Sequence, residues 1–155
     1  MIAISTSPVI GQGSATRAAH SRERDSSSEP EMIKVLFGKL MQAPIQRFPK
    51  LGTSINAPTE PGIYVLYGSK GKVLYVGLAR GAKGLRPRLM THLRDSTWFT
   101  FKYGAALRSR GGFRYLVVEN PRYRALLEAY ATGCLCPTYI GGSQGRLPLI
   151  KMPTT

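Results

Sequence analysis

The stretch that decides the fold is GIYVLYGSKGKVLYVG, residues 62–77 of a chain of 155 residues. Residues 63–67 and 73–77 carry mostly aliphatic and aromatic side chains, of the kinds that favour strands. The residues between them, 68–72, include two glycines and a serine, which suit a turn. We therefore predict a β-hairpin with strands at 63–67 and 73–77.

Downstream of the hairpin, the pattern predicts a helix and then a third strand. The helix is expected over roughly 85–94. Pro87 then lies in its first turn, where a proline is tolerated because its missing N–H costs little. Residues 113–118 are aromatic and β-branched, as a strand prefers. The segment 96–112 alternates only in part and contains three glycines, so no element is assigned there.

A second helix is predicted after the third strand. Asn120 and Pro121 form a typical helix start, since Asn caps free amide groups and Pro suits the first helical position. The helix should run to about Thr132 and end at Gly133. Together these elements predict an α+β fold, in which helices flank a small three-stranded antiparallel sheet.

The N-terminal part is predicted to be less regular. Residues 1–30 are rich in Ser, Thr and Gly without hydrophobic periodicity, so we predict a disordered tail. Residues 31–60 are expected to form a helix and loop extension. Within it, 32–41 suits a short helix or a loose strand, and 42–60 contains several prolines, as a linking loop does. The folded domain is placed at 61–155.

The chain carries a strong positive charge, which lies in its folded part. Lys and Arg number 22 against 8 Asp and Glu, a formal net charge of +14. Residues 1–31 hold 3 of the basic and 4 of the acidic residues, so residues 32–155 carry +15. A domain this basic attracts polyanions, and nucleic acid is the first candidate partner. The alternatives are an anionic membrane surface and a small structural protein of the ribosomal kind.

The sequence carries no sign of a membrane or secreted protein. No apolar run approaches the roughly 20 residues that a membrane span needs, and the N-terminus lacks the pattern of a secretory signal. We expect a cytoplasmic protein without a membrane partner. Cys134 and Cys136 are interpreted as core or surface thiols, because a zinc site needs four ligands.

Carboxylates are scarce in the folded part, which narrows the search for a metal site. Beyond residue 31 the chain has Glu60, Asp95, Glu119 and Glu128. Mg²⁺ is often held by one or two carboxylates with waters and substrate phosphates, so a single Glu can suffice. Glu128 lies in the middle of a predicted helix. Its spacing from Arg124 also suits an ordinary ion pair on the helix surface, and spacing alone favours that interpretation.

Four further side chains suit phosphate chemistry. Tyr64 and Tyr75 lie on the two strands of the hairpin, and nearby cations or a metal-bound water would help a phenol to act near neutral pH. Arg88 and His92 are four residues apart on one helix face, and a guanidinium can stabilise the charge that builds during phosphoryl transfer. The alternatives are cross-strand packing for the tyrosines and a solvated basic face for the helix.

These features, in this order, resemble the GIY-YIG endonuclease family. Gly62-Ile63-Tyr64 matches the first motif, and Tyr75-Val76-Gly77 is a conservative form of the second. The family then has a helix in which an Arg is followed four residues later by a His, here Arg88 and His92. Its last helix carries one metal-binding Glu, here Glu128.

The resemblance implies a metal-dependent endonuclease that hydrolyses DNA phosphodiester bonds. The metal would be Mg²⁺ or Mn²⁺, held by Glu128. Tyr64 or Tyr75 would orient or deprotonate the attacking water. Arg88 would stabilise the pentacovalent phosphate, and His92 would assist in handling the substrate or a proton.

Within the matched region, 61–140, the chain departs from the family at two positions. Many members have Lys directly after the second motif, where this chain has Leu78, and Asn three residues after a Pro, where it has Ile140. These changes leave an alternative, a catalytically weak or inactive nucleic-acid-binding module of the same fold. A literal Tyr139-Ile140-Gly141 follows the last helix. We expect it to lie far from the hairpin and assign it no role.

The remaining cations are expected to hold phosphate. They are Arg80, Lys83, Arg86, Arg94, Arg108 and Arg110. Either of the first two would supply the cation that Leu78 does not. The expected partner is DNA, with branched and damaged forms among the candidates. A chain of this length has little room for a targeting domain, so we expect either a stand-alone nuclease or one that a partner protein recruits. The sequence indicates no oligomeric state.

Overall fold

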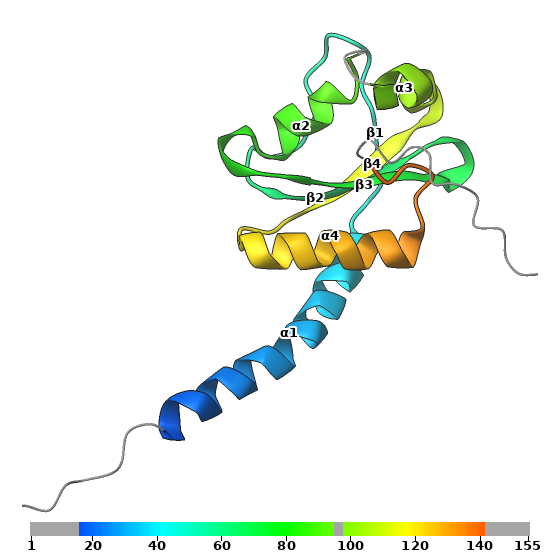
Figure 1. Ribbon diagram of the computed structural model, residues 1–155. Coiled ribbons are helices and arrows are strands. Elements are labelled where there is room, and N and C mark those ends of the chain that lie inside the picture. The colour runs from blue at the N-terminus through cyan, green and yellow to red at the C-terminus, as the bar shows by residue number, and fades with distance from the viewer. Residues whose placement is uncertain (1–15, 95–97, 142–155) are drawn as a thin grey trace, which may run out of the picture. The chain divides into compact units, whose positions relative to one another are not determined.

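The sheet has four strands, one more than the sequence predicted. The computed structural model describes residues 16–94 and 98–141, and its strands there are β1 (Gln46–Arg47), β2 (Gly62–Tyr67), β3 (Val73–Ala79) and β4 (Gly112–Val117). All neighbouring strands are antiparallel, in the order β1-β4-β2-β3 (Figure 1). The α+β class is confirmed, and the number of strands is corrected from three to four.

The extra strand, β1, lies in the segment predicted to be a linking loop. Its two residues pair with Phe113 and Gly112 of β4. The approach is close, because a Cβ atom on Gly112 would lie 2.8 Å from the carbonyl oxygen of Gln46. A two-residue pairing that depends on a distant glycine leaves no alternating pattern in the sequence, which is why this strand was not predicted.

The predicted β-hairpin is confirmed and forms the middle and one edge of the sheet. Tyr64 lies opposite Gly77, and Leu66 lies opposite Tyr75. Because residues that face each other across two strands point to the same side of a sheet, Tyr64 and Tyr75 share a face. Every residue of β2 is buried. The second strand of the hairpin runs further than predicted, to Ala79.

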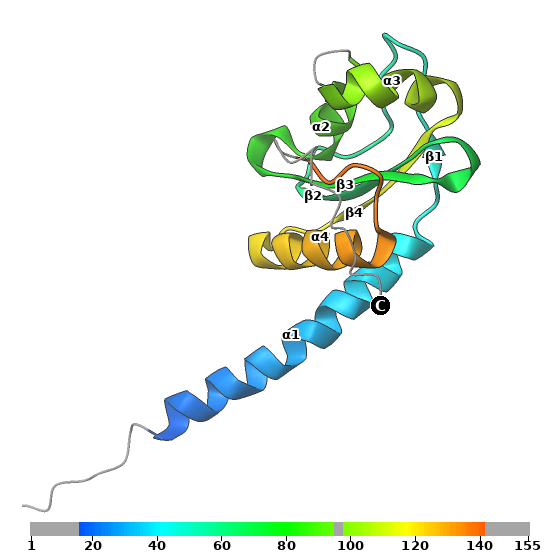
Figure 2. The same ribbon diagram turned by 45° about the vertical axis from the view of Figure 1, so that its right-hand side comes forward.

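Helices cover both faces of the sheet, as Figures 1 and 2 show. α2 (Leu85–Thr91) and α3 (Trp98–Arg110) lie over one face, and α4 (Pro121–Leu135) lies against the other. α2 ends at Thr91 instead of residue 94, because His92 already caps it. α3 occupies most of the segment to which the sequence assigned no element.

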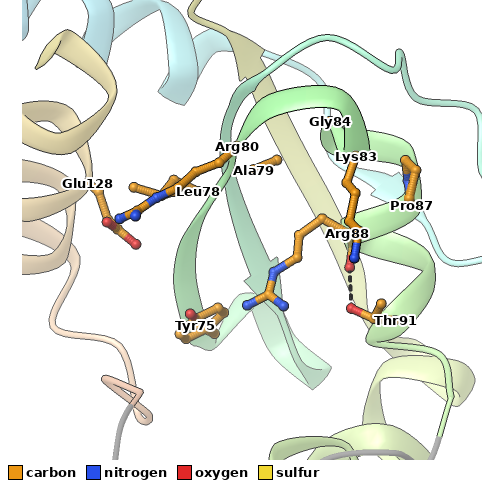
Figure 3. Close-up of a pocket in the computed structure, with 10 residues that line it drawn as sticks. All are labelled: Tyr75, Leu78, Ala79, Arg80, Lys83, Gly84, Pro87, Arg88, Thr91 and Glu128. Carbon is orange, nitrogen blue, oxygen red and sulfur yellow. Dashed lines mark hydrogen bonds between the residues drawn. The ribbon is translucent and has the colours of Figure 1, made fainter. Parts of the chain in front are cut away.

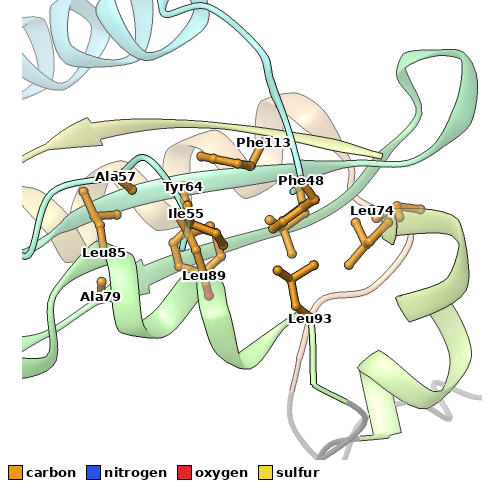
Figure 4. Packing of buried hydrophobic residues seen from close by; sticks show 12 residues of the cluster. Phe48, Ile55, Ala57, Tyr64, Leu74, Ala79, Leu85, Leu89, Leu93 and Phe113 are labelled. Atoms are coloured by element: carbon orange, nitrogen blue, oxygen red, sulfur yellow. The ribbon is translucent and has the colours of Figure 1, made fainter. Parts of the chain in front are cut away.

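Each face of the sheet has its own hydrophobic core, and side chains of β2 alternate between the two. Tyr64 and Leu66 belong to the cluster that contains Leu85 and Leu89 of α2 (Figure 4). Ile63 belongs to the cluster on the other face, with the α4 residues Leu127 and Ala131. Both faces of β2 are therefore buried against hydrophobic side chains. This burial fixes the register of the strand, and the register positions the two tyrosines.

α4 begins where predicted and ends later. The side-chain oxygen of Asn120 accepts hydrogen bonds of 2.9 and 3.2 Å from two backbone amides of the first turn, which confirms the predicted cap. The helix continues through Gly133 to Leu135, and Cys136 ends it in a left-handed conformation with φ of 44°. The predicted end at Gly133 was wrong, since glycine can continue a helix at a modest cost.

The chain reverses after α4 and returns to the sheet. The backbone amide of Thr138 donates to the carbonyl of Val73 at 3.1 Å, and that of Tyr139 donates to the carbonyl of Leu74 at 2.9 Å. Tyr139 therefore lies beside β3, and the expectation that this segment is far from the hairpin was wrong. The cause is the left-handed turn at Cys136, which has no glycine to mark it in the sequence.

The chain divides into two compact units, Met1–Met32 and Ile33–Thr155. The described part of the first unit is helical and belongs to α1 (Thr16–Gln42), where the sequence predicted a disordered tail over 1–30. Residues 16–30 are thus helical in the structure, and the division of the chain at residue 30 stays a prediction. The remaining residues of the predicted tail lie outside the described part of the chain.

The predicted extension, 31–60, supplies buried side chains to both cores. Ile33 and Leu40 join the cluster on the α4 face, and Phe48 and Ile55 join the other cluster. The domain limit at residue 61 stays a prediction. Among the described residues, none of the helices combines the length and the apolar character that crossing a membrane requires.

Candidate active site

A pocket of about 480 Å³ lies along β3, the edge strand of the sheet. Its lining comes from β3 and the loop after it, from α2 and from α4. The residues are Tyr75, Leu78, Ala79, Arg80, Lys83, Gly84, Pro87, Arg88, Thr91 and Glu128 (Figure 3). Because β3 is at the edge, side chains from both layers of helices can reach one pocket. Arg88 of α2 and Glu128 of α4 therefore face the same pocket from opposite layers.

Three of the predicted site residues form a hydrogen-bond chain behind the pocket. Nε of Arg88 donates to the phenol oxygen of Tyr64 at 3.2 Å, and that oxygen lies 2.9 Å from Nε2 of His92. A guanidinium can only donate, so the phenol oxygen accepts from Arg88. The Tyr64 oxygen thus joins Arg88 and His92 in one chain of hydrogen bonds.

Burial keeps the two inner members of this chain uncharged. Burial, and next the neighbouring Tyr75, raise the pKa of Tyr64 far above its ordinary value, while Arg88 acts in the opposite direction. His92 is 6% exposed, and burial together with Arg88 lowers its pKa to about 3. A protonated phenol and a neutral imidazole can share the hydrogen bond between them without a buried charge. Neither side chain is part of the pocket lining.

Tyr75 itself lines the pocket. Its phenol hydrogen-bonds Arg88, so one guanidinium contacts both tyrosines of the hairpin. Burial raises the pKa of Tyr75, whereas Arg88 lowers it and Glu128 raises it further. The ring centroids of Tyr64 and His92 lie 6.1 and 5.8 Å from that of Tyr75. Tyr75 therefore both packs against aromatic rings and lines the pocket.

Gly77 shows why a glycine follows this tyrosine in the second motif. A Cβ atom on Gly77 would lie 2.5 Å from the hydroxyl oxygen of Tyr64 and 2.6 Å from the ring of Tyr75. The missing side chain of Gly77 therefore provides the space in which the two tyrosines meet. Gly84 serves in a similar way before α2: its φ is +48°, and a Cβ atom there would collide with the carbonyl of Thr59.

Glu128 reaches the pocket from α4, beside the outer part of β3. Its carboxylate is hydrogen-bonded to the backbone of Leu78. Burial raises the pKa of Glu128, and Arg80, the Leu78 backbone and Arg88 oppose this effect. Figure 3 shows the guanidinium of Arg80 next to the carboxylate. Two cations and a backbone amide thus stabilise a charged carboxylate in a half-buried place.

The helix-surface ion pair suggested by spacing is not how Arg124 is held. The Arg124 side chain is buried, and its Nη1 donates to the carbonyl oxygens of Val118 and Glu119 at 2.8 and 2.7 Å. It therefore ties the start of α4 to the end of β4. Glu128 points to the pocket instead.

The pocket suits a divalent metal with a single protein carboxylate. Among the described residues, no group of three or more His, Cys, Asp or Glu could hold a metal ion, and Cys134 and Cys136 are exposed free thiols, as expected. Mg²⁺ keeps several waters and takes further ligands from substrate phosphates. The half-buried carboxylate of Glu128, in a pocket that also contains cations for a phosphate, fits such an ion.

The predicted phosphate-binding cations differ in how far they are free to bind. Arg80 and Lys83 line the pocket, in the loop after β3. Arg80 places a positive charge close to Leu78, the position where many family members have Lys. Arg94 and Arg110 are exposed outside the pocket.

Two of these cations also have a structural contact. Nε of Arg86 donates to the carbonyl of Ala57 at 2.6 Å, which fastens the loop before β2 to α2. Nη1 of Arg108 donates to the carbonyl of Leu93 at 3.2 Å. Part of each guanidinium is therefore used within the fold.

Prediction from the chemistry of the side chains did not find three residues that contribute to this site. Leu78 acts on Glu128 through its backbone, and Oγ1 of Thr91 donates to the carbonyl of Arg88 at 2.6 Å. Tyr139 was dismissed, yet its ring centroid lies 5.8 Å from that of Tyr75. The available signal was Pro137, since proline favours the extended backbone that a strand-like contact needs.

Comparison with known proteins agrees with the resemblance seen in the sequence. No protein-family model matches the chain. The chain is 38% identical over 74 residues to UvrABC system protein C of Pseudothermotoga lettingae, and 40% identical over 72 residues to that of Oleidesulfovibrio alaskensis. These regions are 47% and 46% of this chain but 13% and 10% of the relatives, so the chain spans a small part of their length.

A solved domain matches over most of its length. It is the GIY-YIG N-terminal endonuclease domain of UvrC from Thermotoga maritima, bound to magnesium as its catalytic divalent cation. The match has 32% identity and a TM-score of 0.44, and covers 54% of this chain and 85% of that domain. The sequence identity over most of that domain, with both motifs on paired strands, shows that this chain belongs to the GIY-YIG endonuclease family.

Proposed function

We propose that this chain is a metal-dependent endonuclease that hydrolyses phosphodiester bonds in DNA. The observation that best supports this function is the pocket along β3, in which Tyr75, Arg88 and Glu128 come together from one strand and two helices. The net charge of +15 on residues 32–155 and the likeness to an endonuclease domain favour DNA as the substrate, with damaged or branched forms and a recruiting partner protein as candidates.

In the proposed reaction, a water oxygen forms a bond to phosphorus while the bond from phosphorus to one sugar oxygen breaks, and the leaving sugar oxygen takes up a proton from solvent. Tyr75 orients the water and takes its proton in the phenolate form, which Arg88 stabilises against the effect of burial. Arg88 stabilises the negative charge that builds on the phosphate. Tyr64 and His92 act from behind, since their hydrogen bonds hold the guanidinium of Arg88 in one orientation.

Glu128 would hold the divalent metal, either Mg²⁺ or Mn²⁺, together with waters and a phosphate oxygen of the substrate. A bound divalent cation supplies charge neutralisation at the phosphate and lowers the pKa of bound water. Arg80 and Lys83 would hold the neighbouring phosphate, and Arg86, Arg94, Arg108 and Arg110 would extend the contact with the DNA backbone.

The test is nicking of supercoiled plasmid by the full chain with Mg²⁺ or Mn²⁺, with EDTA as the metal-free control. Glu128→Gln should lower the nicking rate by about 100-fold or more, because the variant keeps its shape but loses the metal-binding charge. Glu119→Gln is the matched control, since this exposed carboxylate lies outside the pocket. Glu128→Gln nicking at the wild-type rate would contradict the metal assignment.

A binding module without turnover is the second candidate. Leu78 favours it, because the pocket has an apolar side chain where many family members have Lys. In that case the wild-type chain binds DNA but does not cut plasmid, flap or branched substrates. Leu78→Lys would then be expected to restore cleavage, whereas cleavage by the wild-type chain excludes this candidate.

A further inference from the structure

A third tyrosine approaches the pocket from the segment that follows α4. The amides of Thr138 and Tyr139 donate to the carbonyls of Val73 and Leu74, the two residues of β3 that come directly before Tyr75. Two consecutive hydrogen bonds fix this segment in one register along the outer edge of the strand. The start of β3 is therefore covered, while the part that lines the pocket begins at Tyr75.

The ring of Tyr139 packs on the ring of Tyr75. Their centroids are 5.8 Å apart and the planes are tilted by 44°. The same segment also passes the far end of the Tyr75 ring, because a Cβ atom on Gly141 would lie 3.7 Å from its hydroxyl oxygen. Other neighbours of Tyr75, such as Tyr64, Arg88 and His92, come from β2, α2 and the end of α2. The segment after α4 thus closes a separate side of this ring.

We propose that Tyr139 is a positioning residue for Tyr75, whose ring holds the Tyr75 phenol against Arg88 at the pocket. This inference rests on the proposed function, in which Tyr75 orients the attacking water. Tyr139 is not in the pocket lining, so its effect passes through Tyr75. Because packing of the ring carries the effect, phenylalanine should replace Tyr139 and alanine should not.

The first experiment measures plasmid nicking by Tyr139→Ala and Tyr139→Phe. Tyr139→Ala should lower kcat by up to about 100-fold, since a small misplacement of a reacting group is costly, with KM within about threefold. Tyr139→Phe should keep most of kcat. In a Tyr75→Phe background, Tyr139→Ala should cause no further loss. Ile140→Ala is the matched control, because this neighbouring side chain is 65% exposed and lies outside the pocket lining.

Two kinetic results would overturn the proposal. Equal losses in Tyr139→Phe and Tyr139→Ala would show that the hydroxyl group acts by itself. A full additional loss from Tyr139→Ala in the Tyr75→Phe background would show that Tyr139 does not act through Tyr75.

The second experiment needs no catalytic activity. NMR spectra of the full chain with ¹³C-labelled tyrosine rings, without DNA or metal, identify the Tyr75 signal from its absence in Tyr75→Phe. Tyr139→Ala should shift this signal and change its titration with pH, whereas Tyr139→Phe should leave the signal near its place. An unchanged Tyr75 signal in Tyr139→Ala would overturn the positioning role. A shifted signal in a chain that cuts no DNA would keep that role and contradict the proposed function.

Discussion

At the scale of single residues, Arg88 connects the parts of the site. Its guanidinium hydrogen-bonds the phenols of Tyr64 and Tyr75, so both tyrosines of the hairpin depend on one side chain. The planar fork of arginine can make these contacts and still present a donor to phosphate. Lysine has three donors at one point and cannot reproduce this geometry.

His92 should make the stability of the fold depend on pH. In the folded chain its pKa is lowered to about 3 from 6.5, so below pH 6.5 the unfolded chain takes up a proton that the folded chain refuses. Stability from this group is complete above pH 6.5 and is lost as the pH falls toward 3, by up to about 1.4 kcal/mol per pH unit. Urea unfolding between pH 7 and 4 measures this slope.

A substitution of His92 provides the control for that measurement. His92→Gln should flatten the slope, because it removes the group whose pKa differs between the folded and the unfolded chain. If the slope in His92→Gln equals that of the wild-type chain, the carboxylates and not His92 cause the loss of stability in acid.

At the scale of elements, the side chains of a segment and its neighbours were enough to predict some helices and strands but not others. The hairpin, the third strand and the Asn120 cap were predictable, because strand-forming side chains and capping residues act on their immediate neighbours. β1 depends on Gly112 more than sixty residues away, and the return of Tyr139 to β3 depends on a left-handed Cys136. Such contacts between distant residues leave no periodic pattern in one sequence.

The same distinction applies to the candidate site. The motifs indicated Tyr75, Arg88 and Glu128, and the structure places all three in one pocket. Sequence reasoning did not reveal that Tyr64 and His92 lie beneath the lining, because burial is a property of the packed fold. Nor did it reveal Tyr139, whose contact with Tyr75 arises only after the chain has reversed.

The cap of α4, the helix that carries Glu128, should contribute measurably to the stability of the fold. Asn120→Ala removes the acceptor of two backbone hydrogen bonds and should lower the free energy of unfolding by about 1 kcal/mol. Urea unfolding at pH 7 measures the loss. Asn120→Asp should retain most of the stability, since aspartate also caps helices. A loss in Asn120→Asp as large as that in Asn120→Ala would mean that the cap is not the cause.

At the scale of the whole molecule, the positive charge of the chain should govern how it binds the DNA of the proposed function. Residues 32–155 hold 19 Lys and Arg against 4 Asp and Glu, so the positive charge belongs to the part that contains the pocket. Binding to duplex DNA releases counterions, and the logarithm of the affinity should fall linearly with the logarithm of the salt concentration.

Replacing Arg80 and Lys83 together by alanine should reduce that salt slope by about 2, because each phosphate contact contributes about 0.9. Fluorescence anisotropy with a labelled duplex, at several KCl concentrations and with EDTA to prevent cleavage, measures the slope. Lys50→Ala is the control for loss of charge, since Lys50 is exposed outside the pocket. An unchanged slope in the double variant would place the DNA on another surface.

The edge position of β3 has a consequence for when the site comes into being. Tyr64, Tyr75 and Arg88 belong to the first half of the domain, but Glu128 and Tyr139 follow near its end. During synthesis, a chain that has emerged only as far as α2 lacks both Glu128 and the segment that packs on Tyr75. The pocket is therefore complete only after α4 and the residues behind it have docked on the sheet.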